Sequence, residues 1–149
     1  MDFRRYSSSD IDAIAALELE AFSVGPYSKY MLKKIFHSSN SFNYVGEENG
    51  TIAGYVVALP LDRTSADIES IAVRPSFQHR GLGGKLMDLI EAEMRQRGYK
   101  KSILEVRDRN EETIQFYVKH GYSVTAHLPT YYRELYRGSR GAYRMEKDL

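Results

Sequence analysis

The region that most constrains how this 149-residue chain can fold lies between residues 67 and 97, where a glycine-rich turn joins a strand-like run to an amphipathic helix. The strand-like run, 67–73, reads Asp-Ile-Glu-Ser-Ile-Ala-Val, and the turn, 78–85, reads Gln-His-Arg-Gly-Leu-Gly-Gly-Lys. Glycines that open a helix leave main-chain N–H groups free at the positive end of the helix dipole, with no side chain barring close approach. The pattern predicts a phosphate-binding turn between a strand and a helix.

The spacing excludes two other phosphate-binding patterns. The dinucleotide-binding pattern Gly-x-Gly-x-x-Gly would need a glycine where this chain has Leu86. A Walker P-loop would need a glycine in place of His79 and a Ser or Thr after Lys85. A flexible turn that binds nothing is the alternative that the short motif leaves open.

Composition limits the classes of protein and of chemistry. A length of 149 residues with 42% hydrophobic content fits a single domain over 1–149. A formal net charge of +1 argues against a nucleic-acid partner. There is no cysteine, and the four histidines show no ligand spacing, so we expect no metal. No run reaches the roughly 18 apolar residues of a membrane span and no signal peptide is evident, so we expect a cytoplasmic protein without a membrane partner.

Periodicity and turn residues predict an α/β fold, a mixed, mostly antiparallel sheet with helices on both faces. Helices are expected at about 7–22, 27–36, 82–97 and 110–121. Strands are expected at about 2–6, 42–47, 51–61, 66–73, 102–107, 122–128 and 142–147. The Asn49-Gly50 pair predicts an antiparallel hairpin.

The order Gln78-x-x-Gly81-x-Gly83 after a strand resembles the acetyl-CoA pyrophosphate loop of the GNAT family of N-acetyltransferases, and the predicted element order matches the GNAT fold along nearly the whole chain. The resemblance implies acetyl-CoA as cosubstrate and a splay between the strand before the turn and the next strand, where pantetheine amides can pair with main chain. Arg80 and Lys85 would add cations. The implied coenzyme-binding residues are Ile71, Ala72, Val73, Gln78, His79, Arg80, Gly81, Leu82, Gly83, Gly84, Asn110 and Tyr117.

Glu105 is the leading candidate for the catalytic base, because it interrupts an apolar run in an expected central strand, where desolvation raises a carboxyl pKa toward the working pH. An ion pair with Arg107 or another cation is the alternative, and the residues alone favour neither. The segment Glu105-Val106-Arg107 with Asn110 resembles the bacterial ribosomal-protein alanine acetyltransferase family. That resemblance implies that the glutamate is the base.

Asp67 is the second candidate, because it shares side-chain parity with Ile71 and Val73 and would face the same cleft. The resemblance to archaeal and eukaryotic enzymes implies a second proton acceptor at this place. Glu69 has the same parity but lies nearer the expected coenzyme strand, so it ranks lower. An exposed aspartate at a strand entry is the alternative.

Tyr117 is the candidate general acid, one turn into the helix that Asn110 should cap. The resemblance implies that its phenol lies beside the coenzyme sulfur, and a pKa near 10 suits protonation of a departing thiolate. A core aromatic is the alternative, because Ile114, Tyr117 and Val118 form one apolar stripe. The family also implies a main-chain N–H of residues 71–73 as the oxyanion donor, and a contact between Asn110 and the pantetheine arm.

Two irregular segments with tyrosines, 22–28 and 129–140, should flank the cleft. The Tyr131-Tyr132 pair and residues 141–149 resemble the catalytic subunit of N-terminal α-acetyltransferases, which implies that Tyr131 and Tyr132, with Tyr27 opposite, hold the first residues of a peptide. Gly25 departs from the eukaryotic pattern, which has a glutamate there, so the peptide preference does not transfer. An aromatic cluster at the core edge is the alternative.

Together these features predict an acetyl-CoA-dependent N-acetyltransferase that acts on the N-terminal α-amine of proteins or peptides, similar to the archaeal and bacterial Ard1/RimI group. An α-amine with a pKa near 8 is about one tenth neutral at pH 7, whereas a lysine amine near 10.4 is far less so, and a modest base suffices. A GNAT enzyme for a small amine or a lysine side chain, and a non-catalytic acyl-CoA-binding module, are the alternatives. A partner subunit or a homodimer is left open.

Overall fold

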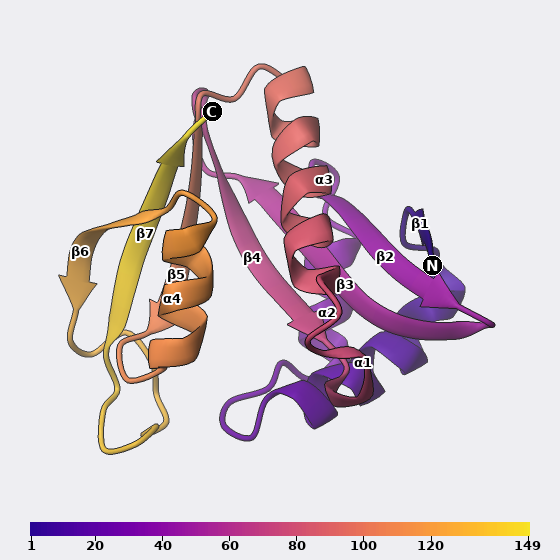
Figure 1. The fold of residues 1–149 in the computed structure, drawn as a ribbon, viewed down its shortest axis with the longest axis horizontal. Coiled ribbons are helices and arrows are strands. Elements are labelled where there is room, and N and C mark those ends of the chain that lie inside the picture. Colours follow the sequence, from indigo (N-terminus) through magenta and orange to yellow (C-terminus); the bar gives the residue numbers. More distant parts are fainter.

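The chain folds into one seven-stranded sheet in the order β1-β2-β3-β4-β5-β7-β6, which a computed structural model describes for all 149 residues (Figure 1). The strands are β1 (Asp2–Arg4), β2 (Phe42–Glu48), β3 (Thr51–Pro60), β4 (Ser65–Val73), β5 (Lys101–Arg107), β6 (Ser123–Leu128) and β7 (Ala142–Asp148). The helices are α1 (Ile11–Ala21), α2 (Lys29–Phe36), α3 (Leu82–Gln96) and α4 (Glu111–Lys119). Only β4 and β5 pair in parallel, so the predicted mixed, mostly antiparallel sheet is confirmed.

Local chemistry explains where the elements begin and turn. Asn49 and Gly50 both have positive φ, 51° and 80°, as a two-residue hairpin between β2 and β3 requires. Asn110 caps α4, because its side-chain oxygen accepts a hydrogen bond from the Thr113 N–H at 3.3 Å. The predicted first helix starts with a single 3₁₀ turn, Ser8–Asp10, before α1. The hairpin and the cap were both predicted from sequence.

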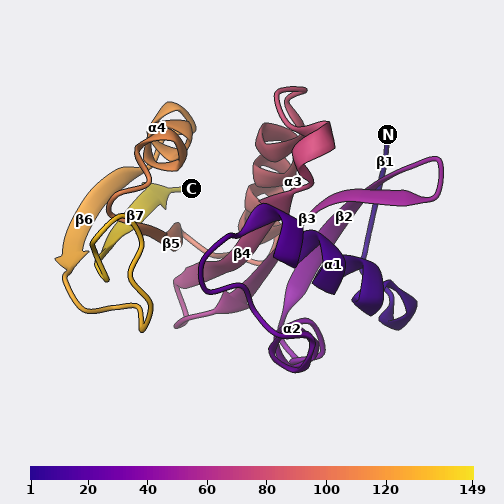
Figure 2. The same ribbon diagram turned by 90° about the horizontal axis from the view of Figure 1, so that it is seen from below.

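The helices bury two separate apolar cores against the sheet. Figure 2 shows α3 and α4 on one face, with α1 and α2 on the other. The core under α3 and α4 includes Leu86, Ile90, Leu104, Val106, Tyr117 and Met145. The core under α1 and α2 includes Ile14, Leu17, Leu32, Phe36 and Tyr55. None of the helices has the length and apolar composition required to cross a membrane.

A fork divides the sheet between β4 and β5. These strands pair only at Ser65–Asp67 with 101–103, and Figure 1 shows them close at one end and far apart at the other. Beyond the fork, β4 stays paired with β3 as far as Val73, and β5 stays paired with β7 as far as Arg107. The facing edges of β4 and β5 are therefore unpaired, as the implied splay requires.

A bulge in β4 corrects one prediction. Ser70 pairs with Val57 and Ile68 pairs with the next β3 residue, Ala58, so Glu69 is an extra residue in β4. Ile68 packs under α3, and so does Ile71, although alternation would place these two residues on opposite faces. The prediction that Asp67 shares a face with Ile71 and Val73 is therefore wrong. Asp67 lies on the opposite face, near Glu105.

Candidate active site

The glycine-rich turn presents a row of free main-chain donors. None of the six consecutive N–H groups from His79 to Gly84 donates to another main-chain group; the first to do so is that of Lys85, to Gly81 at 3.1 Å. Gly81 has a φ of 78°, and a Cβ there would meet nothing within 4 Å. The Gln78 side-chain amide donates to the Val73 carbonyl at 3.2 Å, which ties the turn to β4. Such a row at the start of a 15-residue helix suits a phosphate group.

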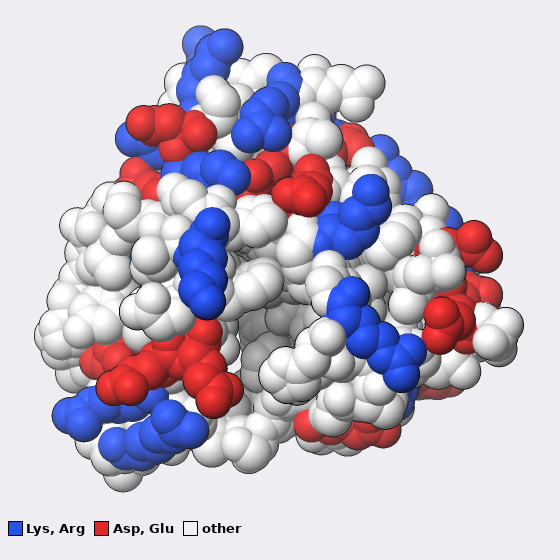
Figure 3. Space-filling view, viewed as in Figure 1, with Lys and Arg blue, Asp and Glu red and all other residues white.

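The turn borders a hollow on the face that carries α3 and α4. Figure 3 shows the hollow at the middle of this face, with Lys and Arg side chains on both sides of it. Gly83 faces the Phe116 ring of α4, which would lie 3.3 Å from an added Cβ. A pocket of about 350 Å³ beside the turn is lined by Arg80 and Lys85 among others. The turn can therefore surround an anion with main-chain donors and two cations.

Tyr117 lies on the same face as the hollow, and its side chain belongs to the core under α3 and α4. Only 7% of the residue is exposed, and its hydroxyl makes no side-chain hydrogen bond. Burial, and next the Tyr132 phenol, raise the pKa of Tyr117 well above its usual value of 10. Tyr132 follows β6 on a separate loop, so the two phenols approach each other from different segments. Tyr117 is therefore a core residue that also lies beside the fork, so the two alternatives given for it from sequence are compatible.

Asp67 and Glu105 lie at the fork on the face opposite to Tyr117. Leu104 and Val106, on either side of Glu105, pack under α3 and α4, so Glu105 points the other way. Burial, and next the charge and hydrogen bonding of Glu105, raise the pKa of Asp67 to about 9. The buried Asp67 Oδ1 has no donor from any other group. The two carboxyls therefore form a pair in which Asp67 is protonated at neutral pH.

The partner of Glu105 is Arg144, which lies opposite it on β7. Arg144 Nε donates to Glu105 Oε2 at 3.1 Å, and the Glu105 side chain is 11% exposed. The ion pair with Arg107 that the sequence left open is not formed, because Arg107 turns toward the loop that follows β6. The ion-pair alternative is therefore realised with another cation, Arg144. Burial raises the pKa of the second candidate, Asp67.

The tyrosines predicted for substrate binding come together around these carboxyls. The Tyr27 hydroxyl donates to Glu69 at 3.3 Å. The Tyr131 and Tyr132 rings are perpendicular, with centroids 4.9 Å apart. Burial, and next Glu105, raise the pKa of Tyr131 to about 12, so the Tyr131 phenol lies near the carboxyl pair. Burial likewise raises the pKa of Glu69.

Three contributors were missed from sequence: Glu18, Arg144 and the contacts of Arg107. Glu18 is buried in α1 and accepts hydrogen bonds from the Tyr27 N–H at 2.8 Å and from the Tyr55 hydroxyl. Its signal was available, since it extends the apolar stripe formed by Ile14 and Leu17. No local signal could have paired Arg144 with Glu105, because that contact depends on strand register.

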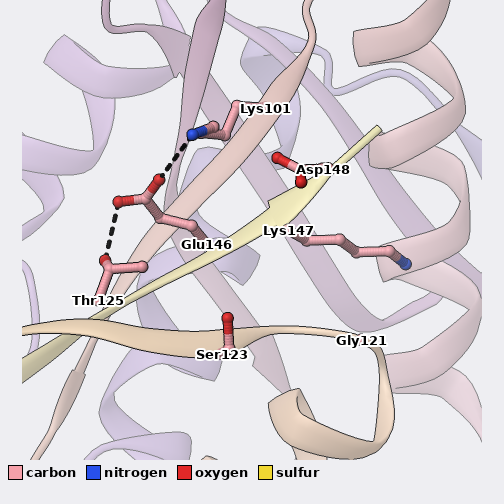
Figure 4. Close-up of a pocket in the computed structure, with 7 residues that line it drawn as sticks. All are labelled: Lys101, Gly121, Ser123, Thr125, Glu146, Lys147 and Asp148. Carbon is pink, nitrogen blue, oxygen red and sulfur yellow. Dashed lines mark hydrogen bonds and ion pairs between the residues drawn. The ribbon is translucent and has the colours of Figure 1, made fainter.

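A second pocket, of about 420 Å³, lies away from these residues, at the end of the sheet formed by β5, β6 and β7 (Figure 4). Its lining contains no hydrophobic side chain, and the Lys101 ammonium is paired with Glu146 at 3.4 Å. None of the residues predicted from sequence lines it. No group of three or more His, Asp or Glu side chains is arranged to hold a metal ion.

Known proteins are similar to this chain over most of its length. The model of the acetyltransferase (GNAT) family matches residues 11–122. An N-acetyltransferase of Methanocaldococcus jannaschii is 31% identical over 137 residues, which cover 90% of this chain and 85% of the relative. The ribosomal protein bS18-alanine N-acetyltransferase of Escherichia coli is 30% identical over 129 residues, covering 84% and 82%.

Solved structures of the same kind superpose over almost the whole chain. The crystal structure of the ribosomal-protein-S18-alanine N-acetyltransferase from Escherichia coli gives a TM-score of 0.89 at 26% identity, covering 99% of this chain and 93% of that one. Ard1 from Thermoplasma volcanium gives 0.85 at 30% identity, covering 99% and 97%. Because the family model spans most of the chain and the fold agrees, this chain belongs to the GNAT family and is an acetyl-CoA-dependent N-acetyltransferase.

Proposed function

We propose that this enzyme transfers the acetyl group of acetyl-CoA to the N-terminal α-amine of a protein or peptide. The observation that carries the proposal is the fork between β4 and β5, with a proton-bearing tyrosine on one face and a carboxyl pair on the other. The coenzyme would enter from the face of the glycine-rich turn and the amine from the face of the carboxyls. The relatives named for ribosomal-protein alanine acetylation and as Ard1 support a protein N-terminus as the acceptor.

Proton removal falls to the carboxyl pair. Glu105, held by Arg144, is the proposed base, and Asp67 is protonated at neutral pH. An α-ammonium with a pKa near 8 needs only a modest acceptor, and binding next to several acidic groups favours its approach. As the amine nitrogen bonds to the acetyl carbon, the carbon–sulfur bond breaks, and the proton lost by the nitrogen goes to the carboxyl pair.

Tyr117 is the proposed acid for the departing thiolate. Its raised pKa keeps the phenol protonated throughout the physiological range, so a proton is always available there. No side-chain acceptor competes for this proton. A main-chain N–H of residues 71–73, on the unpaired edge of β4, would stabilise the oxyanion, and that edge together with Asn110 would hold the pantetheine arm.

The first residues of the peptide would lie between two loops. The first loop, 22–28, presents Tyr27, and the second loop, 129–141, presents Tyr131 and Tyr132. Tyr131 is 48% exposed, so its ring is available to a ligand, whereas Tyr27 is held by Glu18 and Glu69. Aromatic rings with one polar end suit a peptide backbone beside a short side chain.

A small polyamine is the second candidate substrate, favoured by one observation. Asp67, Glu69 and Glu105 crowd the amine side, and Arg144 is the one cation that contacts any of the three carboxyls through a hydrogen bond. A substrate with two ammonium groups would relieve this repulsion.

A competition experiment separates these substrates. The enzyme is incubated with acetyl-CoA, peptides with free α-amines, matched peptides with a blocked α-amine and an internal lysine, and spermidine, and the acetylated atoms are located by mass spectrometry. We expect acetyl groups on free α-amines alone. Acetylation of spermidine or of the internal lysine, with free α-amines unmodified, would overturn the proposal.

A further inference from the structure

Arg107 is placed unusually for an arginine at the end of a sheet. It lies two residues after Glu105 on β5, and its side chain is only 13% exposed. Its guanidinium carbon lies 3.8 Å from the centroid of the Tyr132 ring. Its Nη1 donates to the Glu134 carbonyl at 2.7 Å, and its Nη2 lies 3.7 Å from the Glu134 carboxylate. A planar guanidinium can stack and donate at once, which an ammonium cannot do.

The same guanidinium also reaches the first loop. A Cβ built on Gly25 would lie 3.2 Å from Arg107 Nη2 and 3.1 Å from Glu134 Oε2. Gly25 has a φ of 65°, a conformation that favours glycine. The two loops, more than 100 residues apart in sequence, therefore meet at Arg107, directly beside the side chains that would hold the amine.

The other hydrogen bonds of the second loop do not connect it to the first loop. Tyr132 and Arg140 bond to each other within the loop, through the Tyr132 N–H and the Arg140 Nε. Ser139 and Arg137 bond to Asp108 and Arg109, in the turn before α4. Arg107 is thus the side chain that contacts Tyr132 and Glu134 on one side and lies against Gly25 on the other.

We infer that Arg107 is a positioning residue that fastens the two loops together and so sets the width of the opening through which the amine substrate enters. This inference rests on the proposed function only in taking the carboxyl face as the entrance for the amine. Arg107 does not contact the glycine-rich turn, so it acts on binding of the amine and leaves binding of acetyl-CoA unaffected. Gly25 is part of the same contact between the loops, because a side chain there would push the loops apart.

The kinetic test compares Arg107→Ala and Arg107→Lys with the wild type. We expect the KM of the amine substrate to rise about tenfold in Arg107→Ala, as loss of a stacked and hydrogen-bonded guanidinium would cause, with the KM of acetyl-CoA unchanged. Arg107→Lys should recover only part of the loss, since an ammonium has no plane to stack. Arg63→Ala is the matched control, because Arg63 is exposed in the β3–β4 turn and makes no hydrogen bond or ion pair.

A structural readout accompanies the kinetics. The second loop contains Arg133, Arg137 and Arg140, three trypsin sites, and limited proteolysis with mass spectrometry measures how quickly each is cut. We expect faster cleavage in this loop for Arg107→Ala and for Gly25→Ala, with cleavage elsewhere and in Arg63→Ala unchanged. Gly25→Ala keeps the arginine, so it tests the contact between the loops even if Arg107→Ala folds poorly.

Two results would overturn the inference: equal increases in the KM of both substrates, or cleavage of the second loop at the wild-type rate in both Arg107→Ala and Gly25→Ala. The proposed function is judged separately, by which atom the wild-type enzyme acetylates. If that atom belongs to a small amine, the same KM comparison is made with that amine, and the inference about Arg107 stands or falls on its own.

Discussion

The two sides of the fork are built in different ways. On the coenzyme side, consecutive main-chain N–H groups between His79 and Gly84 form the binding surface. On the amine side, the surface consists of side chains from β4, β5 and β7 and from the two loops. Main-chain donors are identical in every residue except proline, so the first surface tolerates side-chain changes that keep the turn. The second surface depends on each side chain and on its partners.

Because of this difference, we expect the turn to set the affinity for the coenzyme, and the side chains of the amine side to set the selection of the amine and the removal of its proton. The donors of the glycine-rich turn are main-chain amides, which do not titrate. On the amine side, burial and nearby charges shift the pKa values of two carboxyls, Asp67 and Glu69, and of three tyrosines, Tyr27, Tyr131 and Tyr132. Substitutions on the two sides should therefore change different kinetic constants.

The largest expected effect is that of Glu105→Gln, which removes the proposed base. We expect kcat to fall by about 10²-fold or more, as loss of a proton-transfer group commonly causes. The KM of acetyl-CoA should not change, because Glu105 lies on the amine side. Steady-state kinetics check this, with Glu146→Gln as the control, since Glu146 pairs with Lys101 away from the fork. A kcat within twofold of the wild type would remove Glu105 from the mechanism.

Tyr117→Phe should lower kcat to a similar extent, about 10²-fold, while calorimetry finds CoA binding retained. Because the Tyr117 hydroxyl makes no side-chain hydrogen bond, thermal stability should hardly change. Tyr122→Phe is the opposite case, since the Tyr122 hydroxyl bonds to Ser102 and Glu91 inside the core. That variant should lose stability and keep its rate. If Tyr117→Phe keeps full activity, Tyr117 is only a core residue.

Gly81→Ala probes the coenzyme side and should have an intermediate effect. A side chain at a φ of 78° costs about 1–2 kcal/mol, so the turn should relax, and CoA binding should weaken roughly tenfold. Gly98→Ala is a matched control, with a φ of 88° and equal free space at the far end of α3. Gly98→Ala should lower the stability of the protein and leave CoA binding unchanged. Equal CoA affinity in the Gly81 variant and the wild type would mean that the turn does not bind the diphosphate.

The smallest expected effect is a change of stability with pH in Asp67→Asn. Since folding raises the pKa of Asp67 to about 9 from a usual value near 4, its contribution to stability is fully present below pH 4 and is lost as pH rises toward 9. Asparagine does not ionise, so the variant should gain in Tm over the wild type between pH 5 and pH 8. If the Tm of the variant and the Tm of the wild type change equally with pH over this range, Asp67 is not buried in its neutral form.

Sequence reasoning predicted most of the fold, because the deciding signals are local. The Asn49-Gly50 hairpin, the Asn110 cap and the glycines around α3 each act within a few residues, and all appear where expected. The same locality explains the free donors of the glycine-rich turn. The bulge at Glu69 was not predicted, since it depends on the register between β3 and β4, and that error placed Asp67 on the wrong face.

The sequence by itself determined the glycine-rich turn and the order of the elements, because these follow from short-range conformational preferences. The candidate acid and bases came from sequence as well, but through the resemblance to the GNAT family. Only the tertiary structure decided that Asp67 is buried beside Glu105, that Arg144 holds Glu105, and that Arg107 lies between the two loops. These relations connect strands and loops far apart in the chain. They depend on strand register, on a bulge and on burial, which no local pattern specifies.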